Sequence, residues 1–325
     1  MSFGYAPEGR PPIDVHGGDP YDPWVPSASC SIDQIELMPR DPFPVFLISI
    51  LNSCIGWFCL PFITVATWII GTTRAKMRPV HERPAFYHDM AKGWGSAICR
   101  SLRLRVHVEG REHLDSWLES GAAVIVCNHN SLMDIPALLD SLPGRFNFVA
   151  KAEVFRVPLL GEFIRRAGYI SLIRGDRKEA TRSLDNAAKA LEDGWSPLLF
   201  AEGTRSFDGK LQRFKRGAIL LAARTQRPIL PMAIVGMHEQ ISRNCLVCRP
   251  GEVTIRVGAP FMIDLDLDSA SEETIQQVVE QVRSRVANLL DPSIRKTYRI
   301  RERAVKPLIR PELRRAFRPA ILDDL

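Results

Sequence analysis

Short apolar runs alternate with longer stretches of helical periodicity through most of the chain. Apolar residues at helical spacing are clearest over Lys178–Glu192 and Arg216–Arg224. This alternation predicts an α/β fold, a mostly parallel sheet flanked by helices. The short runs, which we expect to be buried strands, are Leu104–Val108, Ala122–Val126, Phe146–Ala150, Tyr169–Ile173, Pro197–Phe200, Ile229–Val235 and Val253–Val257.

A further amphipathic stretch, Glu272–Leu290, follows the last of these runs. Its apolar residues recur every three or four positions, so we expect a helix with one buried face. Ser269 and Glu272 have the spacing of a capping box, which predicts that the helix begins at Ser269.

The most apolar part of the chain lies between Asp41 and Arg74, where no residue is charged. A membrane-spanning helix needs about 20 apolar residues, and Pro61 divides this stretch into two halves that are each shorter. We therefore predict an N-terminal apolar helical hairpin, broken at Pro61, that provides membrane attachment by entering one leaflet. A single tilted span, or a buried hairpin in a soluble core, is the alternative.

Composition divides the chain into four regions. Residues 1–41 are rich in proline and predict a disordered or extended lead-in. Residues 42–75 hold the membrane-associated apolar helices, residues 76–292 the α/β domain, and residues 293–325 a basic tail. That tail accounts for the whole net charge of +6, which favours an anionic surface such as lipid headgroups or nucleic acid.

The seven cysteines are scattered and form no obvious disulfide framework, so a reducing compartment fits the chain best. The first forty residues contain no apolar core of a signal peptide. Together these features predict a membrane protein whose α/β domain lies on the cytoplasmic face.

Polar residues with chemical potential follow the predicted strands. His129 comes directly after the run Ala122–Val126 and before an amphipathic segment that starts near Ser131. If the chain turns sharply there, the Asp134 carboxylate can reach one imidazole nitrogen and leave the other as an oriented general base. A helix-capping pair without catalytic function is the alternative for His129 and Asp134.

Cationic and hydroxyl side chains follow other strands. Gly203 can allow a close approach of the backbone to a ligand, while Arg205 offers a planar fork for an anion, with Thr204 beside it. Arg174 and Lys151 follow two further strands. Because the carboxyl ends of parallel strands share one edge of a sheet, these residues are expected to line one site.

Four segments, in this order, resemble the motifs of the glycerolipid acyltransferases of the 1-acylglycerol-3-phosphate type. The specific ones are the His-x4-Asp block from His129 to Asp134 and the segment Phe200–Ser206, in which Ala201 replaces the usual proline. The other two are Tyr169–Arg174 and the looser Pro228–Ala233; the family's Phe-Lys-x-Gly-Ala also matches Phe214–Ala218.

The resemblance implies an O-acyltransferase of phospholipid biosynthesis. It would move a fatty acyl group from acyl-CoA or acyl carrier protein to a lysophospholipid hydroxyl, 1-acylglycerol-3-phosphate being the expected acceptor. His129 and Asp134 would be catalytic, while an acyl-serine route through Ser131 is the competing idea. The residues that would bind the acceptor phosphate are Glu202, Gly203, Thr204, Arg205, Arg174 and Lys151.

The resemblance implies no metal, no cofactor beyond the thioester cosubstrate and no nucleic acid partner. Another lysolipid acceptor, or a non-catalytic lipid-binding protein that keeps the fold, remains an alternative. The sequence leaves open the acyl chain length, the choice between CoA and carrier protein, and the oligomeric state.

Overall fold

The computed structural model describes residues 43–173, 177–243, 245–291 and 309–310. The predicted lead-in, Arg174 and nearly all of the predicted basic tail lie outside these residues. The chain divides into two compact units, Met1–Phe46 and Leu47–Leu325. In the first unit, only the opening residues of helix α2 are described, so the account below concerns the second.

The described residues form helices and strands in alternation. The helices are α2 (Phe43–Ala75), α3 (Arg83–Ser101), α4 (Arg111–Ser120), α5 (Asp134–Ser141), α6 (Leu160–Arg166), α7 (Arg177–Glu192), α8 (Gly217–Thr225), α9 (Met237–Gln240) and α10 (Glu272–Leu289), with 3-10 turns at Val80–Glu82 and Ala152–Arg156. The strands are β1 (Leu104–Glu109), β2 (Val124–Cys127), β3 (Phe146–Lys151), β4 (Ile170–Leu172), β5 (Ser196–Phe200), β6 (Ile229–Val235), β7 (Gly251–Val257), β8 (Met262–Ile263) and β9 (Ile309–Arg310).

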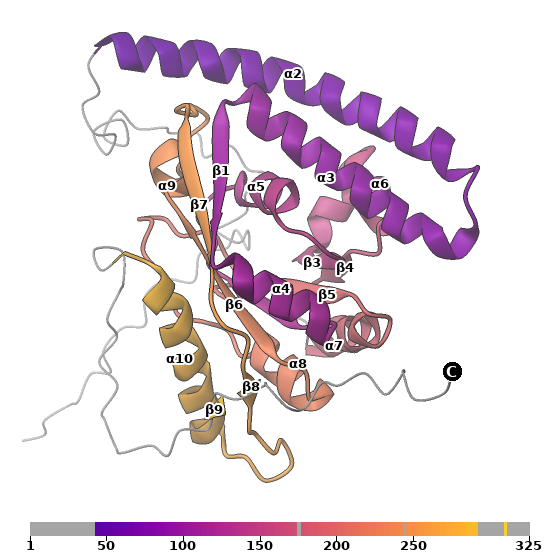
Figure 1. Cartoon of the computed structure of the whole chain (residues 1–325), viewed down its shortest axis with the longest axis vertical. Coiled ribbons are helices and arrows are strands. Elements are labelled where there is room, and N and C mark those ends of the chain that lie inside the picture. Colours follow the sequence, from indigo (N-terminus) through magenta and orange to yellow (C-terminus); the bar gives the residue numbers. More distant parts are fainter. Residues whose placement is uncertain (1–42, 174–176, 244, 292–308, 311–325) are drawn as a thin grey trace, which may run out of the picture. The chain divides into compact units, whose positions relative to one another are not determined.

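Among the described residues, seven strands form one sheet in the order β1-β7-β6-β2-β5-β3-β4 (Figure 1). Neighbouring strands run parallel except β6 and β7, which are antiparallel. The predicted fold class, a mostly parallel sheet flanked by helices, is therefore confirmed. The central strand β2 lies between β5 and β6, so whatever follows it stands in the middle of the sheet.

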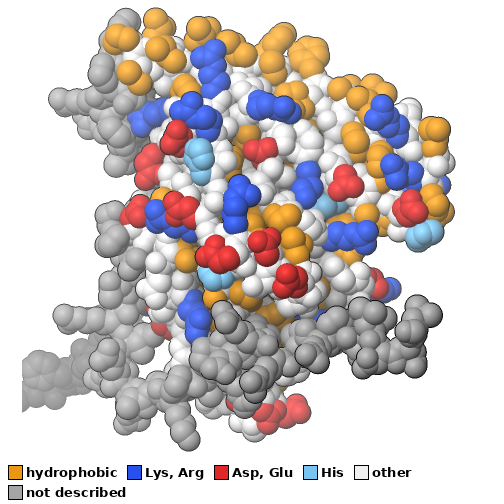
Figure 2. Space-filling view, viewed as in Figure 1, with side chains coloured by type: hydrophobic (Ala, Val, Ile, Leu, Met, Phe, Trp, Pro, Cys, Tyr) orange, Lys and Arg blue, Asp and Glu red, His pale blue; other side chains and the backbone are white. Residues whose placement is uncertain are grey.

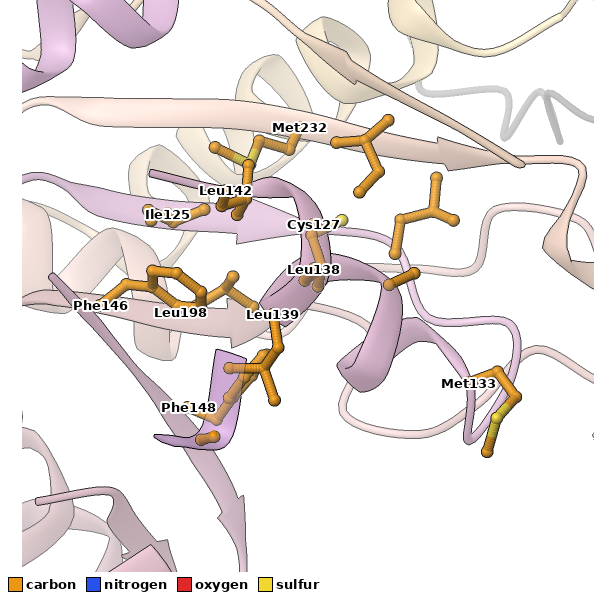
Figure 3. Packing of buried hydrophobic residues seen from close by; sticks show 14 of the residues in the cluster. Ile125, Cys127, Met133, Leu138, Leu139, Leu142, Phe146, Phe148, Leu198 and Met232 are labelled. Atoms are coloured by element: carbon orange, nitrogen blue, oxygen red, sulfur yellow. The ribbon is translucent and has the colours of Figure 1, made fainter. Parts of the chain in front are cut away.

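The sheet is buried on both faces, which explains its continuous apolar runs. Along β2, Ile125 and Cys127 face one core, whereas Val124 and Val126 face the other. The first core includes Leu138 and Leu139 of α5, packed against the strands as Figure 3 shows. The second core is built from the apolar faces of α7, α8 and α10.

The predicted hairpin broken at Pro61 is wrong, because Phe43–Ala75 is one continuous helix with Pro61 inside it. A proline removes one backbone hydrogen bond, at a cost of about 3 kcal/mol. Here residues on both sides of the proline pack against the same domain, and these contacts hold the two halves in line. The chain reverses direction only after Ala75, and α3 then returns along α2 (Figure 1).

The packing of α3 on α2 is antiparallel and close. The Trp94 indole N–H donates to the Thr64 hydroxyl at 3.1 Å. At the far end, a Cβ on Gly56 would stand 2.1 Å from Cδ2 of the buried Leu102, so a larger residue would force that side chain to shift. The result is that α2, from Leu47 onward, belongs to the same compact unit as the sheet.

Two opposite stripes run along α2. One faces the domain, with Ser49, Asn52 and Ser53 buried in its first part and the half-buried Trp57, Leu60, Ile63 and Trp68 packed against the core. The other is apolar and exposed, and is visible as the band along the upper edge of Figure 2. We call it the α2 stripe; its side chains are 41–69% exposed, and it consists of Leu51, Ile55, Phe58, Phe62, Val65 and Ile69. By length and composition, Pro44–Ala75 is apolar enough to cross a membrane.

Two predicted helix starts are corrected. Helix α10 begins after Ser271, whose hydroxyl accepts a hydrogen bond from the Thr274 N–H, whereas the Ser269 hydroxyl binds Asp266. The predicted Ser269 cap therefore lies two residues too early. Helix α5 begins at Asp134 rather than near Ser131, because the intervening residues form the turn that holds His129.

Candidate active site

The site begins where β2 ends. The side chain of Asn128 takes the place of a further strand peptide, because its amide donates to the Ile234 carbonyl at 3.0 Å and accepts from the Ile234 N–H at 2.7 Å. These two bonds continue the β2–β6 contact by one residue beyond the ladder. The backbone leaving Asn128 is thus held rigidly at the carboxyl edge of the sheet.

His129 and Asp134 form the predicted pair. The distance from His129 Nδ1 to Asp134 Oδ2 is 2.7 Å. The same oxygen accepts the backbone N–H groups of Asn130 and Ser131 at 2.7 and 2.9 Å. Asp134 is completely buried, so one carboxylate oxygen fixes both the turn and the imidazole ring. The Asp134 carboxylate thus reaches one imidazole nitrogen of His129, as a sharp turn between the strand and the helix was expected to allow.

The remaining ring nitrogen of His129 faces away from Asp134. The imidazole stacks on Phe200 of β5 at 3.9 Å between ring centroids and 13° between planes. Among the described residues no hydrogen bond to Nε2 occurs, and the side chain is 16% exposed. A carboxylate oxygen 2.7 Å from Nδ1 favours the tautomer with the proton on Nδ1, in which Nε2 is an acceptor.

Glu202, which was predicted to bind the acceptor phosphate, forms hydrogen bonds with the backbone of the site. Its carboxylate accepts the His129 N–H through Oε1 and the Gln212 N–H through Oε2, both at 2.8 Å. The residue is only 3% exposed. Arg283 of α10 supports this arrangement by donating to the Gln212 carbonyl at 2.9 Å. Since both oxygens accept backbone N–H groups, Glu202 helps to fix the turn that carries His129, and its binding of a phosphate stays a prediction.

Replacing Glu202 with glutamine is expected to change how stability depends on pH. Burial raises the pKa of the Glu202 carboxyl from 4.5 to about 7, against the opposing effect of its two N–H donors. The folded chain holds this proton more tightly than the unfolded chain. Protonated Glu202 therefore contributes roughly 3 kcal/mol to the free energy of unfolding below pH 4.5. This contribution is lost as the pH rises through 7. Glu202→Gln should flatten this slope in denaturant unfolding between pH 5 and 8.

The control is Glu273→Gln, an exposed glutamate in α10. The pH dependence of its free energy of unfolding should match the wild type. Equal slopes for the Glu202 and Glu273 variants would contradict the assigned burial effect.

The loop after β5 brings Arg205 beside His129. Gly203 has φ +73°, a left-handed conformation that favours glycine and turns the loop back. The Ser206 N–H then donates to the His129 carbonyl at 2.6 Å. Burial, and next the charge of Arg243, lower the pKa of Arg205, while Asp134 raises it. The Arg205 guanidinium therefore lies in the electrostatic field of the catalytic pair.

Of the two other predicted cations, Lys151 is described by the structure and Arg174 is not. Lys151 ends β3 at the same carboxyl edge and forms a salt bridge of 3.6 Å with Glu153. Its side chain is 18% exposed. Arg174 lies outside the described residues, two positions after β4, so its role stays a prediction.

Two candidate nucleophiles beside His129 are buried. Ser131 is 1% exposed, and its hydroxyl accepts the Met133 N–H at 3.3 Å. Cys127 is wholly buried, and burial raises the pKa of its thiol well above the usual range. A covalent acyl-enzyme needs an accessible nucleophile. This burial favours direct transfer over the acyl-serine route.

Backbone N–H donors near the site are mostly engaged. The N–H groups of His129, Asn130, Ser131 and Gly203 all have acceptors. Among the described residues, those of Thr204 and Arg205 have none. The N–H groups of Thr204 and Arg205 are therefore the ones in this part of the site that can donate to a developing oxyanion.

Sequence reasoning missed Arg243, which contacts Arg205 from the loop after α9. It follows no strand, so the strand-end pattern that found the other residues gave no signal for it. No group of three or more His, Cys, Asp or Glu side chains suited to a metal ion occurs in the described ranges.

The fold and the site together define an α/β protein with a histidine oriented by an aspartate at the carboxyl edge of its sheet. Residues 105–235, which run from β1 to the end of β6, match the family model described as Acyltransferase. This part of the chain is similar to the acyltransferase family, and the resemblance that the motifs predicted is confirmed.

Individual relatives carry more specific names. A 1-acyl-sn-glycerol-3-phosphate acyltransferase of Cocos nucifera is 32% identical over 200 residues, covering 58% of this chain and 64% of the relative. A chloroplastic 1-acyl-sn-glycerol-3-phosphate acyltransferase of Arabidopsis thaliana, LPAT1, is 36% identical over 154 residues, covering 47% of this chain and 42% of the relative. The chain thus spans 42–64% of the length of these two relatives.

A solved structure is similar over most of the chain. The crystal structure of the 1-acyl-sn-glycerophosphate (LPA) acyltransferase PlsC from Thermotoga maritima superposes with a TM-score of 0.61 at 28% sequence identity. The match covers 75% of this chain and 96% of that chain.

Proposed function

We propose that the chain is a membrane-attached 1-acylglycerol-3-phosphate O-acyltransferase. It transfers a fatty acyl group from acyl-CoA or acyl carrier protein to the acceptor hydroxyl, giving phosphatidic acid. The observation that carries the proposal is the His129–Asp134 hydrogen bond of 2.7 Å, formed beside the Arg205 loop. The names of the relatives support the choice of acceptor.

His129 acts as the general base. As the acceptor hydroxyl oxygen attacks the thioester carbonyl carbon, Nε2 takes the hydroxyl proton. Asp134 then stabilises the imidazolium through its bond to Nδ1. When the carbon–sulfur bond breaks, His129 returns the proton to the leaving thiolate. A thioester is already activated, so this route needs no protein nucleophile.

The backbone N–H groups of Thr204 and Arg205 stabilise the oxyanion of the tetrahedral intermediate. Their place in the loop that binds the His129 carbonyl through Ser206 supports this role. The Arg205 side chain binds the acceptor phosphate, with Lys151 and Arg174 as further cations of the same edge. Gly203 provides the turn that presents this loop.

The α2 stripe attaches the enzyme to the membrane without crossing it. The buried side of α2 is fixed to the domain along its length, from Asn52, which donates to the Leu102 carbonyl, to Ala75. A helix held in this way lies along the interface with one face in lipid. Arg74 in its last turn, and Lys76 and Arg78 just beyond it, suit anionic headgroups. The domain is expected to face the cytoplasm, where thioesters are made available.

An acceptor panel tests the proposed function. Purified full-length protein receives one labelled acyl-CoA and, in separate reactions, lysophosphatidic acid, other lysophospholipids or monoacylglycerol. We expect labelled phosphatidic acid and one free thiol per product. Thiol release with a different lysolipid alone would change the acceptor, and no release with any acceptor or donor would support a lipid-binding protein without turnover.

Arg205→Ala is expected to weaken use of the acceptor. Charge-assisted hydrogen bonds to a phosphate are roughly twice as strong as neutral ones. We expect the KM for lysophosphatidic acid to rise about tenfold or more, with the KM for acyl-CoA nearly unchanged. Steady-state kinetics with each substrate varied in turn measures both constants. If only the acyl-CoA constant rises, Arg205 belongs to the donor site.

A further inference from the structure

Two arginines from separate loops hold each other at the edge of the site. Arg243 Nη1 donates to the carbonyl oxygen of Arg205 at 3.0 Å. In return, Arg205 Nη1 donates to the carbonyl oxygen of Arg243 at 3.5 Å. This exchange joins the loop after β5 to the loop after α9, which are 38 residues apart in the sequence.

The bonded arginines adjoin the catalytic turn. The peptide whose carbonyl Arg243 binds is the one whose N–H, from Ser206, donates to the His129 carbonyl. One peptide group thus separates the Arg243 guanidinium from the backbone of the general base. An anion bound there would lie close to the hydroxyl that His129 deprotonates.

The charges at this point favour an anionic ligand. Among the described residues, Arg205 forms no salt bridge with a carboxylate, and both arginines are half-buried. Burial and the nearby Arg243 charge lower the pKa of Arg205, so bringing these guanidinium groups together has an electrostatic cost. A phosphomonoester with two negative charges offsets this cost and accepts paired N–H donors from each planar fork.

The loop that carries Arg243 is also fixed to the membrane-facing helix. The Cys248 N–H donates to the Ser53 hydroxyl at 2.7 Å, and Asn52 donates to the Cys248 carbonyl at 3.2 Å. The Trp57 indole donates to the Leu246 carbonyl at 2.6 Å, while the Leu246 side chain is 73% exposed. One loop therefore joins α2 to the arginine pair. This connection places the pair on the path of a lipid headgroup that enters from the membrane side.

We propose that Arg243 is a second phosphate ligand of the acceptor site and sets the preference for a phosphomonoester headgroup. This inference rests on the proposed acyl transfer and adds to it a specificity-determining residue. Arg243 and Arg205 together bind the terminal phosphate through their guanidinium groups. A neutral headgroup, or a phosphodiester with one negative charge, leaves the pair without a matching ligand.

The test compares Arg243→Gln with Arg243→Lys. Glutamine keeps an N–H donor for the Arg205 carbonyl but removes the charge, whereas lysine keeps the charge but loses the planar fork. For Arg243→Gln we expect kcat/KM with lysophosphatidic acid to fall about 10- to 100-fold through KM. Arg243→Lys should be intermediate, and the KM for acyl-CoA should stay unchanged in both.

The control is Arg249→Gln in the same loop. Arg249 also donates to a backbone carbonyl, that of Glu239, at 3.3 Å. It should keep the wild-type KM for lysophosphatidic acid. Melting temperatures of all three variants, measured on the full chain in detergent, separate misfolding from lost binding.

A second measurement is independent of turnover. Inorganic phosphate and glycerol 3-phosphate should raise the melting temperature of the wild type and of Arg249→Gln, and should have a smaller effect on Arg243→Gln. Equal stabilisation of all three proteins would overturn the inference. So would an equal fall in kcat/KM with lysophosphatidic acid and with lysophosphatidylcholine, or a rise confined to the KM for acyl-CoA. Failure of the wild type to acylate any lysolipid would instead overturn the proposed function.

Discussion

Replacing His129 with alanine is expected to reduce acyl transfer about 100- to 10,000-fold, the usual contribution of a positioned general base. Without the imidazole, Asp134 Oδ2 still accepts the N–H groups of Asn130 and Ser131, so the chain should remain folded and membrane-bound. The measurement is single-turnover formation of phosphatidic acid from labelled acyl-CoA and lysophosphatidic acid. Retention of more than a tenth of the wild-type rate would contradict the role assigned to His129.

Two further variants test whether the loss of activity is specific to His129 and depends on the Asp134 charge. His107→Ala changes an exposed histidine of β1 and should keep full activity. Asp134→Asn keeps an oxygen that can accept the N–H groups of Asn130 and Ser131 but removes the negative charge facing the ring. It should therefore fold and lose activity to a degree comparable with His129→Ala. Full activity of Asp134→Asn would mean that the ring needs no carboxylate.

The second large effect is expected on membrane binding. Leu51, Phe58 and Phe62 of the α2 stripe are 60–69% exposed, and burying an apolar side chain contributes about 1.5–3 kcal/mol. Changing all three to glutamine should therefore weaken binding to vesicles by roughly 4 kcal/mol, or about 1,000-fold. Co-sedimentation with phosphatidylcholine–phosphatidylglycerol vesicles measures the partition coefficient.

Controls separate the stripe from exposed apolar surface in general. Phe58→Gln alone should weaken binding, whereas Leu118→Gln, which changes a 45% exposed residue of α4, should not. The triple variant should retain its fold, because none of its residues faces the domain. Membrane binding equal to wild type would overturn the interfacial arrangement of α2. Labelling of an N-terminal tag from outside intact cells would mean that the segment spans the membrane.

The central part of the site was predictable because its signals are local. His129 and Asp134 are five positions apart, and a turn between strand and helix brings them together. The loop carrying Arg205 follows an adjacent parallel strand, so shared strand ends were enough to predict that these residues are neighbours.

Other features depend on contacts that periodicity does not encode. Periodicity gives no signal that the Glu202 carboxylate accepts two backbone N–H groups, because every residue except proline provides such a donor. Arg243 reaches the site through a loop without strand periodicity. Pro61 predicted a break on intrinsic propensity, whereas packing along the whole of α2 keeps the helix continuous.

The attachment of α2 limits how this protein can be shortened. Deleting residues 43–75 would remove the partner of Leu102 at Gly56 and leave the Cys248 peptide without Ser53 and Asn52. It would also uncover an apolar surface around α3 that the helix now shields. A fragment that begins at residue 76 would lose the exposed α2 stripe but would expose the apolar surface that α2 now covers. Solubilisation by polar substitutions on the α2 stripe, with the helix retained, is the better strategy for purification and crystallisation.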